Sequence, residues 1–370
     1  MKFTCEKNAL VSAISVASRT VAQKSTIPAL EGIYIRAGVK LTLSGYNLET
    51  GITISVDADI QETGACIMPS RLFFDIIRKL PDDTVSISVD ENFKVSIRGG
   101  ISSFSITAMS SEDYPELPEV ESDKGISLPQ NELKAMIGGT SFAVSENQAR
   151  PIHTGCLFEV EDSSITVVAV DGYRLALRRW KSEEPIGRTL KFVVPAAALK
   201  EAEKILGDTD EACTFFLGSK HILFTIGEAT LVCRLLEGEF LDWRRVLPQN
   251  QPVKLAVNVA KMTDSIERVG LIISEKLKSP VRCKFGENTA DFRSVSTIGE
   301  AHDVCQIAGD GQDMEIGFNC RYLLDALRAI PDAECSLELI NGLSPIVMNP
   351  CDGSERYSYM VLPVRLKAGE

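Results

Sequence analysis

Three segments of the chain share one helical pattern of hydrophobic positions. They are "PSRLFFDIIRKLP" from Pro69, "PAAALKEAEKILG" from Pro195 and "NCRYLLDALRAIP" from Asn319. Each places apolar residues at i, i+3, i+4 and i+7 and stops at Pro or Gly, which predicts an amphipathic helix of about three turns. The first two starts are 126 residues apart, and the last two are 124 apart.

A second set of helical segments keeps almost the same spacing. Leu10 in "KNALVSAIS", Leu133 in "QNELKAMIG" and Met262 in "NVAKMTDSIE" follow one another at 123 and 129 residues. In addition, "LTLSGYNLETGI" around Gly45 aligns with "ITVVAVDGYRLAL" around Gly172, 127 residues later. We interpret the chain as three similar tandem domains. Their predicted bounds are 1–122, 123–249 and 250–370.

Short stretches rich in β-branched and aromatic residues lie between the predicted helices. "GIYIRAG", "TVSISVD", "CLFEVED" and "ATLVCRLL" are typical of half-buried antiparallel strands. Each repeat is therefore predicted to be α+β, with two helices packed on antiparallel sheets. Proline-containing stretches at 110–125 and 247–252 are predicted to be extended connectors.

Composition and charge indicate a folded protein in a reducing compartment. The 370 residues carry a formal net charge of −12, which disfavours nonspecific adhesion to phosphate or anionic membranes. The 10 cysteines are evenly spread without a CxxC pair, so we expect buried thiols rather than disulfides or zinc. The polar stretch 6–8 interrupts any signal-peptide core, and no apolar run reaches the roughly 18 residues of a membrane span. A cytoplasmic location is expected.

The sequence offers no recognisable catalytic machinery. It lacks the GxxxxGK and GxGxxG phosphate loops, the HExxH metal motif and the GxSxG nucleophile motif. Its three histidines, His153, His221 and His302, are far apart, and "GDGQDME" at 309–315 lacks the alternation of a calcium loop. We therefore predict a non-catalytic protein with no metal and no cofactor.

Basic residues are concentrated in the six predicted helices. These segments hold 12 basic and 8 acidic residues, about +4 in total, and leave 27 basic and 43 acidic residues elsewhere. One interpretation is a single positive surface, formed if the helices of every repeat face the same way. The other, which the sequence leaves open, is that the helices carry balanced charge pairs. The segments are 6–20, 70–80, 130–144, 195–206, 258–273 and 319–330.

The chain end, "YMVLPVRL" from Tyr359, is apolar where most chains become polar and fray. The run from Met360 to Leu366 is interpreted either as a last buried strand or as the rim of a binding groove. The two interpretations are compatible, because alternate residues of a strand point to opposite faces.

The repeats and three sequence motifs resemble a known family. Three tandem repeats together with "VDGYRLALRR", "LLEGEFLDWRRVLP" and "YMVLPVRL" look like the bacterial DNA polymerase III beta subunits, the sliding clamps, over essentially the full chain. The resemblance implies a head-to-tail homodimer whose six domains close a ring around double-stranded DNA. Helices would line the hole, sheets would form the outside, and the ring would tether the replicative polymerase for processivity. DNA would be held topologically, without sequence recognition.

The resemblance further implies a hydrophobic groove for a short peptide motif. Partners would be the polymerase III alpha subunit, the clamp loader delta subunit, other polymerases and repair proteins. Apolar walls would give affinity, and arginines with backbone groups would fix the orientation of the peptide. The matching positions are Val170, Gly172, Arg174, Leu175, Leu241, Arg245, Val246, Pro345, Met360, Leu362, Pro363, Val364 and Arg365.

Two other sets of residues follow from the same resemblance. Ring closure would bring Phe104 and Ile106 against Ile272 and Ile273 of the next protomer. The sequence leaves open the alternative that each of these four residues belongs to the core of its own domain. The DNA-facing set combines family positions with basic residues of the helices. It comprises Lys24, Arg71, Arg78, Lys79, Lys134, Gln148, Lys200, Lys204, Lys261, Arg268, Arg321 and Arg328.

Three groove positions depart from the family pattern. Val170 replaces the usual threonine, Leu241 a common proline, and His153 an aliphatic residue. These departures leave the peptide preference open. Two alternative functions also remain: an enzyme with a site between repeats, which the scarcity of histidine argues against, and a clamp-fold adaptor that binds peptides without acting on DNA.

Overall fold

The computed structural model describes residues 1–121, 124–273 and 279–366. The chain forms two compact units, each built from two separate stretches. Unit 1 combines Met1–Lys134 with Lys200–Leu235, and unit 2 combines Ala135–Leu199 with Leu236–Glu370. The middle of the chain therefore contributes to both units.

Unit 1 contains two antiparallel sheets and a pair of helices. The five-stranded sheet has the order β5-β1-β7-β8-β9, and the eight-stranded sheet has the order β10-β15-β16-β17-β4-β3-β2-β6. The bounds are β1 Lys2–Glu6, α1 Lys7–Ala17, β2 Gly32–Ala37, β3 Leu41–Tyr46, β4 Thr50–Val56, β5 Asp59–Glu62, β6 Gly64–Pro69, α2 Ser70–Lys79, β7 Thr84–Val89, β8 Lys94–Gly99, β9 Ser102–Thr107, β10 Ile126–Pro129, β15 Ala212–Leu217, β16 His221–Ile226 and β17 Ala229–Arg234.

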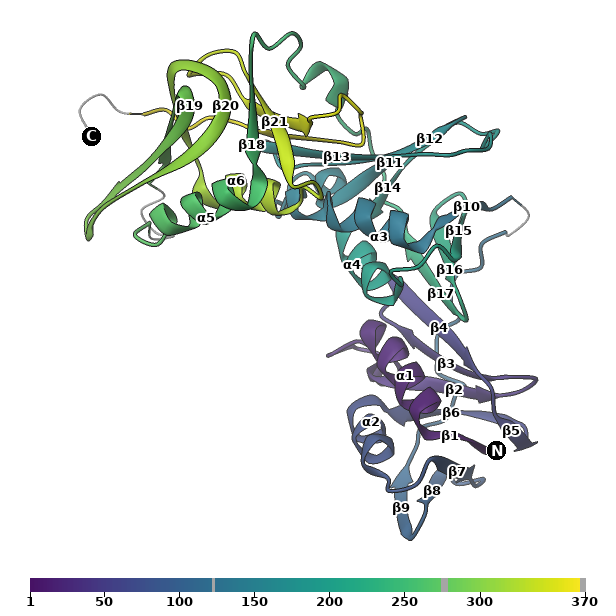
Figure 1. Ribbon diagram of the computed structural model, residues 1–370. Coiled ribbons are helices and arrows are strands. Elements are labelled where there is room, and N and C mark those ends of the chain that lie inside the picture. Colours follow the sequence, from purple (N-terminus) through teal and green to yellow (C-terminus); the bar gives the residue numbers. More distant parts are fainter. Residues whose placement is uncertain (122–123, 274–278, 367–370) are drawn as a thin grey trace. The chain divides into compact units, whose positions relative to one another are not determined.

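The core of unit 1 is formed by the apolar faces of α1 and α2 on both sheets. Leu10, Ile14, Phe73 and Ile77 are fully buried in it, at the helical spacing read from the sequence. The two helices lie side by side (Figure 1). The Glu6 carboxylate caps α1 by accepting hydrogen bonds from backbone amides of its first turn.

Unit 2 is organised by one ten-stranded antiparallel sheet. Its order is β14-β11-β12-β13-β23-β22-β21-β18-β20-β19, with β19 and β20 forming a long hairpin (Figure 1). Helices α3 Gln130–Gly138 and α4 Ala196–Ile205 each span the division between the units. The remaining bounds are β11 Gly155–Glu161, β12 Ser164–Val170, β13 Arg174–Lys181, β14 Leu190–Pro195, β18 Val253–Asn258, α5 Val259–Gly270, β19 Val281–Ser296, β20 Gly299–Phe318, α6 Cys320–Arg328, β21 Glu334–Leu339, β22 Ile346–Pro350 and β23 Tyr357–Val361.

The six predicted helices and the antiparallel strands are confirmed. Several helices are shorter than predicted. The helix predicted over 6–20 ends at Ala17 and is followed by a 3₁₀ turn from Ser18, and the helix predicted over 130–144 ends at Gly138. Sheets run across the repeats: β17 of the middle repeat pairs with β4, and β13 pairs with β23. This sharing explains why the compact units do not coincide with the sequence repeats.

One detail of the predicted repeat is wrong. The sequence pattern aligns Gly45 with Gly172, an offset of 127 residues. In the structure, the turn after β3 and the turn after β12 are equivalent, so Asn47 corresponds to Asp171, an offset of 124. In both turns the side chain accepts hydrogen bonds from the amides two and three residues ahead. Gly45 therefore lies inside β3, whereas Gly172 lies in a turn.

The cysteines are free and mostly buried, as the sequence predicts. All 10 cysteines are free thiols, and eight are buried, whereas Cys320 is half-buried and Cys351 is exposed. Burial raises the pKa of the Cys233 thiol to about 12, so this thiol stays protonated at neutral pH. No helix in the described ranges is long and apolar enough to cross a membrane.

Gly45 provides a test of the packing of α1 on β3. A Cβ atom at Gly45 would lie 2.0 Å from the carbonyl oxygen of Ala17, the last residue of α1. We expect Gly45→Ala to lower the free energy of unfolding by about 1–3 kcal/mol, because the helix end must shift. Urea denaturation measures the loss. Gly38→Ala is the matched control, because the nearest atom to its Cβ would be 3.8 Å away; equal losses in both variants would contradict the packing argument.

Candidate functional site

An apolar cluster in unit 2 collects residues from three distant parts of the sequence. We call it the connector cluster. Register places Leu175 of β13 between Val170 of β12 and Met360 of β23, and Met360 beside Val347 of β22. The buried members are Leu157, Val168, Val170, Leu175, Leu177, Val193, Phe240, Trp243, Val347 and Met360; Ile152, Leu236, Leu241, Leu247 and Leu362 are partly exposed and pack against them.

The connector, residues 236–251, is fixed to this sheet face by Trp243. The indole of Trp243 is buried, and its Nε1 donates to Glu159 Oε2 at 3.0 Å. Arg244 covers the Trp243 ring at 4.2 Å and also donates to Glu159, at 2.8 Å. Burial acts to raise the pKa of Glu159, but the hydrogen bonds from Trp243, Arg244 and Lys191 outweigh it and leave this pKa below its usual range. The carboxylate thus stays charged and holds the connector.

A tight turn at residues 171–173 forms one end of the cluster. Gly172 adopts a φ of 90°, a left-handed conformation that favours glycine. Asp171 Oδ1 accepts hydrogen bonds from the amides of Tyr173 and Arg174 and closes the turn. The Tyr173 side chain is 61% exposed and stacks on Tyr322 of α6, with ring centroids 6.0 Å apart. An exposed aromatic side chain therefore lies at the turn between Val170 and Leu175 of the connector cluster.

Arg174 is buried and its donors are used inside the protein. Its guanidinium donates to Asp171 at 2.8 Å, to Asp325 of α6 at 2.7 Å and to the carbonyl oxygen of Phe142 at 2.7 Å. It also lies over the Tyr322 ring at 4.4 Å. Arg174 therefore positions the turn and α6, a different role from the contact with peptide implied by the family resemblance.

The chain end runs along the edge of the cluster. The Leu362 amide donates to the carbonyl oxygen of Tyr173, and the Val364 amide donates to that of Gly317, both at 2.8 Å. A Cβ at Gly317 would lie 2.5 Å from the Leu366 side chain, so glycine lets the tail lie this close. Strand β23 confirms the interpretation of "YMVLPVRL" as a last buried strand up to Val361, and the tail after it is partly exposed. The interpretation of the tail as the rim of a groove stays a prediction.

The structure brings together most of the groove residues named from the sequence. Val170, Leu175 and Met360 are buried members of the connector cluster, while Leu241 and Leu362 are partly exposed and pack against it. Val246 is 40% exposed, Val364 is 38% exposed and the Arg245 side chain is 87% exposed, paired with Asp242 at 3.0 Å. Gly172 lies in the turn before β13, and Pro363 and Arg365 lie in the tail after β23. Pro345 immediately precedes β22 and is not a member of the cluster.

Sequence reasoning missed several cluster residues. Leu177 follows Leu175 in the alternation of β13, so the period-two pattern could have found it. Trp243 and Leu247 lie within the quoted connector motif, but nothing in the sequence shows that they cover the sheet. His153 contacts Phe240 edge-on at 5.4 Å, and burial together with Arg150 lowers its pKa, so the ring is predominantly neutral at pH 7.

The predicted DNA-facing residues divide into two groups. Six basic side chains pair with carboxylates: Arg78 with Asp75, Lys134 with Asp208, Lys204 with Glu201, Arg268 with Asp303, Arg321 with Asp325 and Arg328 with Glu267. Five other basic side chains have no ion-pair partner among the described residues: Lys24, Arg71, Lys79, Lys200 and Lys261. Gln148, the one uncharged member of the set, is exposed. The interpretation of balanced charge pairs therefore fits about half of the cations.

The residues predicted for ring closure are partly exposed to solvent in their own units. β9 is the outermost strand of its sheet, and its Phe104 is 40% exposed while Ile106 is half-buried. Ile272 and Ile273 follow α5 and are half-buried, next to Leu271, which is 83% exposed.

Within the described ranges, no group of three His, Cys, Asp or Glu residues could hold a metal ion.

Three family models match consecutive parts of the chain. They describe the N-terminal, central and C-terminal domains of the DNA polymerase III beta subunit and match residues 1–118, 127–242 and 244–365. Fold and matches together define a protein of the clamp class, with three α+β domains. The chain belongs to the family of DNA polymerase III beta subunits, the beta sliding clamps, which are non-catalytic and confer processivity on the polymerase.

Individual relatives cover nearly the whole chain. The beta sliding clamp of Staphylococcus epidermidis strain RP62A is 32% identical, over 99% of both chains. Among solved structures, the Bacillus subtilis sliding clamp is 30% identical with a TM-score of 0.94, over 99% of this chain and 100% of that one. A DNA polymerase III beta subunit from Eubacterium rectale is 32% identical with a TM-score of 0.93, over 98% and 99%.

The role of Arg174 as a buried positioning residue can be tested by its removal. We expect Arg174→Ala to lower the free energy of unfolding by about 3 kcal/mol, because Asp171 and Asp325 lose their shared cation in a buried site. Denaturation followed by circular dichroism measures this change. Arg245→Ala, which removes an exposed arginine, should change stability by at most about 0.5 kcal/mol. Similar values for the two variants would mean that Arg174 is not a structural anchor.

Proposed function

We propose that the connector cluster and the segments around it form the groove that binds the short peptide motif of this clamp's partners. The observation that carries the proposal is a buried apolar floor with a partly exposed edge. Val170, Leu175 and Met360 form that floor, and Leu241 and Leu362 flank it. Partners would be the polymerase III alpha subunit, the clamp loader delta subunit, other polymerases and repair proteins.

The chemistry of this groove favours aliphatic or aromatic anchors. Each buried anchor side chain contributes about 1.5–3 kcal/mol from the loss of apolar surface to water. Polar orientation would come from Arg245 and from backbone groups of the tail, since Arg174 is buried and already donates to Asp171, Asp325 and Phe142. Leu241 and Val170, which replace proline and threonine of the family pattern, make this groove more apolar.

We further propose that two copies close a ring around double-stranded DNA. Two open sheet edges support this arrangement: β9 has one neighbour, and residues 299–306 of β20 pair only with β19 among the described residues. Unpaired strand edges are templates for pairing with another chain. Phe104 and Ile106 of one copy would meet Ile272 and Ile273 of the next, a heterologous contact that closes by rotation.

The DNA-facing surface would be weakly positive. Lys24, Arg71, Lys79, Lys200 and Lys261 have no ion pair in the described part of the chain, so their charge is available to phosphates. We also propose that the three domains of the clamp meet at residues 122 and 249. The protein would act in the cytoplasm, where the bacterial chromosome is replicated.

The tail provides the sharpest test of the groove. Removing residues 362–370 should weaken binding of a fluorescent peptide with glutamine, leucine and phenylalanine anchors by at least about tenfold, because Leu362 and the exposed tail are lost. Strand β23 ends at Val361 and stays intact, so the dimer should persist. Fluorescence polarisation and sedimentation velocity measure the two properties.

A shorter truncation is the matched control for this experiment. Removing residues 367–370 alone should leave peptide affinity unchanged, because Leu362 to Leu366 remain. Loss of the dimer in the longer truncation would mean that the tail is chiefly structural. Unchanged peptide binding in that truncation would contradict the groove.

Retention on DNA tests the ring. The protein should sediment near twice 40.4 kDa, stay on nicked circular DNA after loading and leave when the circle is cut. Phe104→Asp should give monomers and abolish retention, because it places a charge at the apolar contact. Native protein that leaves closed and cut circles equally fast would contradict topological binding.

Charge reversal separates a DNA clamp from a peptide-binding adaptor of the same fold. Reversing Arg71, Lys79, Lys200 and Lys261 should shorten retention and flatten its salt dependence, because unpaired cations release counterions when they meet phosphates. Reversing Arg98 and Lys94, which lie outside the proposed surface on β8, is the control. Retention that is unaffected by the first set would favour the adaptor.

A further inference from the structure

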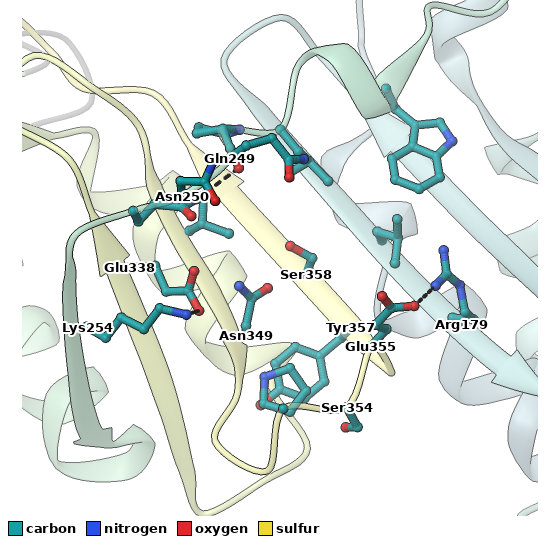
Figure 2. A pocket seen from close by; sticks show the side chains of 18 residues that line it. Arg179, Gln249, Asn250, Lys254, Glu338, Asn349, Ser354, Glu355, Tyr357 and Ser358 are labelled. Carbon is teal, nitrogen blue, oxygen red and sulfur yellow. Dashed lines mark hydrogen bonds and ion pairs between the residues drawn. The ribbon is translucent and has the colours of Figure 1, made fainter.

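A second pocket lies under the connector, beyond the residues assigned to the groove. It has a volume of about 420 Å³, within the range of ordinary ligand pockets. Its walls are the connector at 247–251, the outer parts of β13, β22 and β23, and the loop 353–355 (Figure 2). None of its lining residues belongs to the set that the family resemblance assigns to the peptide groove.

The pocket and the groove share one face of the same sheet. Along β13, Leu175 of the groove floor is followed on that face by Leu177, which lines the pocket. The same step leads from Met360 to Ser358 on β23 and from Val347 to Asn349 on β22. Two residues of a strand span about 7 Å, so two or three further residues of an extended peptide would reach the pocket.

The pocket is polar but nearly neutral. Its cations are matched by carboxylates, Arg179 with Glu355 and Lys254 with Glu338 at 3.2 Å (Figure 2). A strongly charged ligand would therefore find no net attraction here. The chemistry favours a neutral partner that makes hydrogen bonds.

Four side chains in the pocket have unused hydrogen-bonding groups. Asn349 and Ser358 lie on the sheet and Gln249 and Asn250 on the connector, and none has a side-chain hydrogen bond to any described residue. A carboxamide both donates and accepts, which matches the alternating N–H and C=O groups of an extended backbone. Apolar surface from Leu177, Leu247 and Val347 lies beside them.

We propose that this pocket binds the residues that flank the anchor motif of a partner peptide, through hydrogen bonds from Asn349, Ser358 and Gln249 to the peptide backbone. The proposal rests on the groove of the proposed function and extends it. The occupant is an extended, uncharged segment continuous with the anchored motif. Partners with such a flank would bind more tightly than partners with the motif alone.

Peptides of different length test this extension. The probes are a labelled five-residue peptide with glutamine, leucine and phenylalanine anchors, and the same peptide with four serine or alanine residues added at either its amino or its carboxyl end. One extended peptide should bind about threefold to tenfold more tightly than the short one, from one or two added hydrogen bonds. Asn349→Ala with Ser358→Ala should remove this gain and leave the affinity for the short peptide unchanged.

Controls keep the outcomes separate. Gln249 lies on the exposed connector outside the strands, so Gln249→Ala should reduce the gain without disturbing the sheet. Asn92→Ala, in the β7–β8 turn, should leave the gain unchanged. The extension is wrong if neither longer peptide gains affinity, or if the gain survives in the variants, while the short peptide still binds. Failure of the short peptide to bind native protein would overturn the groove itself, and this extension with it.

Discussion

Pairing of β13 with β23 is the constraint on which the rest of unit 2 depends. It joins strands from the middle and the end of the chain, with Arg174 opposite Val361 and Leu175 opposite Met360. A slip of one residue would turn every side chain to the other face. Leu175 and Met360 would then leave the floor of the connector cluster. The register therefore sets the floor of the proposed groove, and the same register places Leu177 and Ser358 in the pocket under the connector.

Arg174 reinforces this register at the end of β13. Its ion pairs with Asp171 and Asp325 tie the turn before the strand to α6. Removing charges from water is costly, so such a buried cluster contributes little net stability but penalises arrangements that separate its members. The Leu362 amide, which donates to Tyr173, then holds the tail beside the same turn. Turn, helix and tail are thus positioned by one buried cation.

The sequence predicted the elements better than their long-range contacts. Helical spacing located Leu10 and Phe73 in the core, and alternation located the strands, because both signals are local. The repeat offset of Gly45 was wrong because an isolated glycine matches either a turn or a close helix contact. The family resemblance named Val170, Leu175 and Met360, which the structure brings together in one apolar cluster. It could not supply the partners of Arg174, since Asp325 lies 151 residues away and its contact depends on tertiary packing.

Charge pairing on the helices bears on how a clamp can hold DNA and still slide. Each cation that meets a phosphate steepens the salt dependence and tightens nonspecific binding. Arg78, Lys204 and Arg328 are already opposed by carboxylates of the protein, which reduces the number available to DNA. If closure of the ring provides retention, affinity is free to be low. A surface with only part of its cations unpaired, in a protein of net charge −12, is consistent with movement along DNA rather than arrest on it.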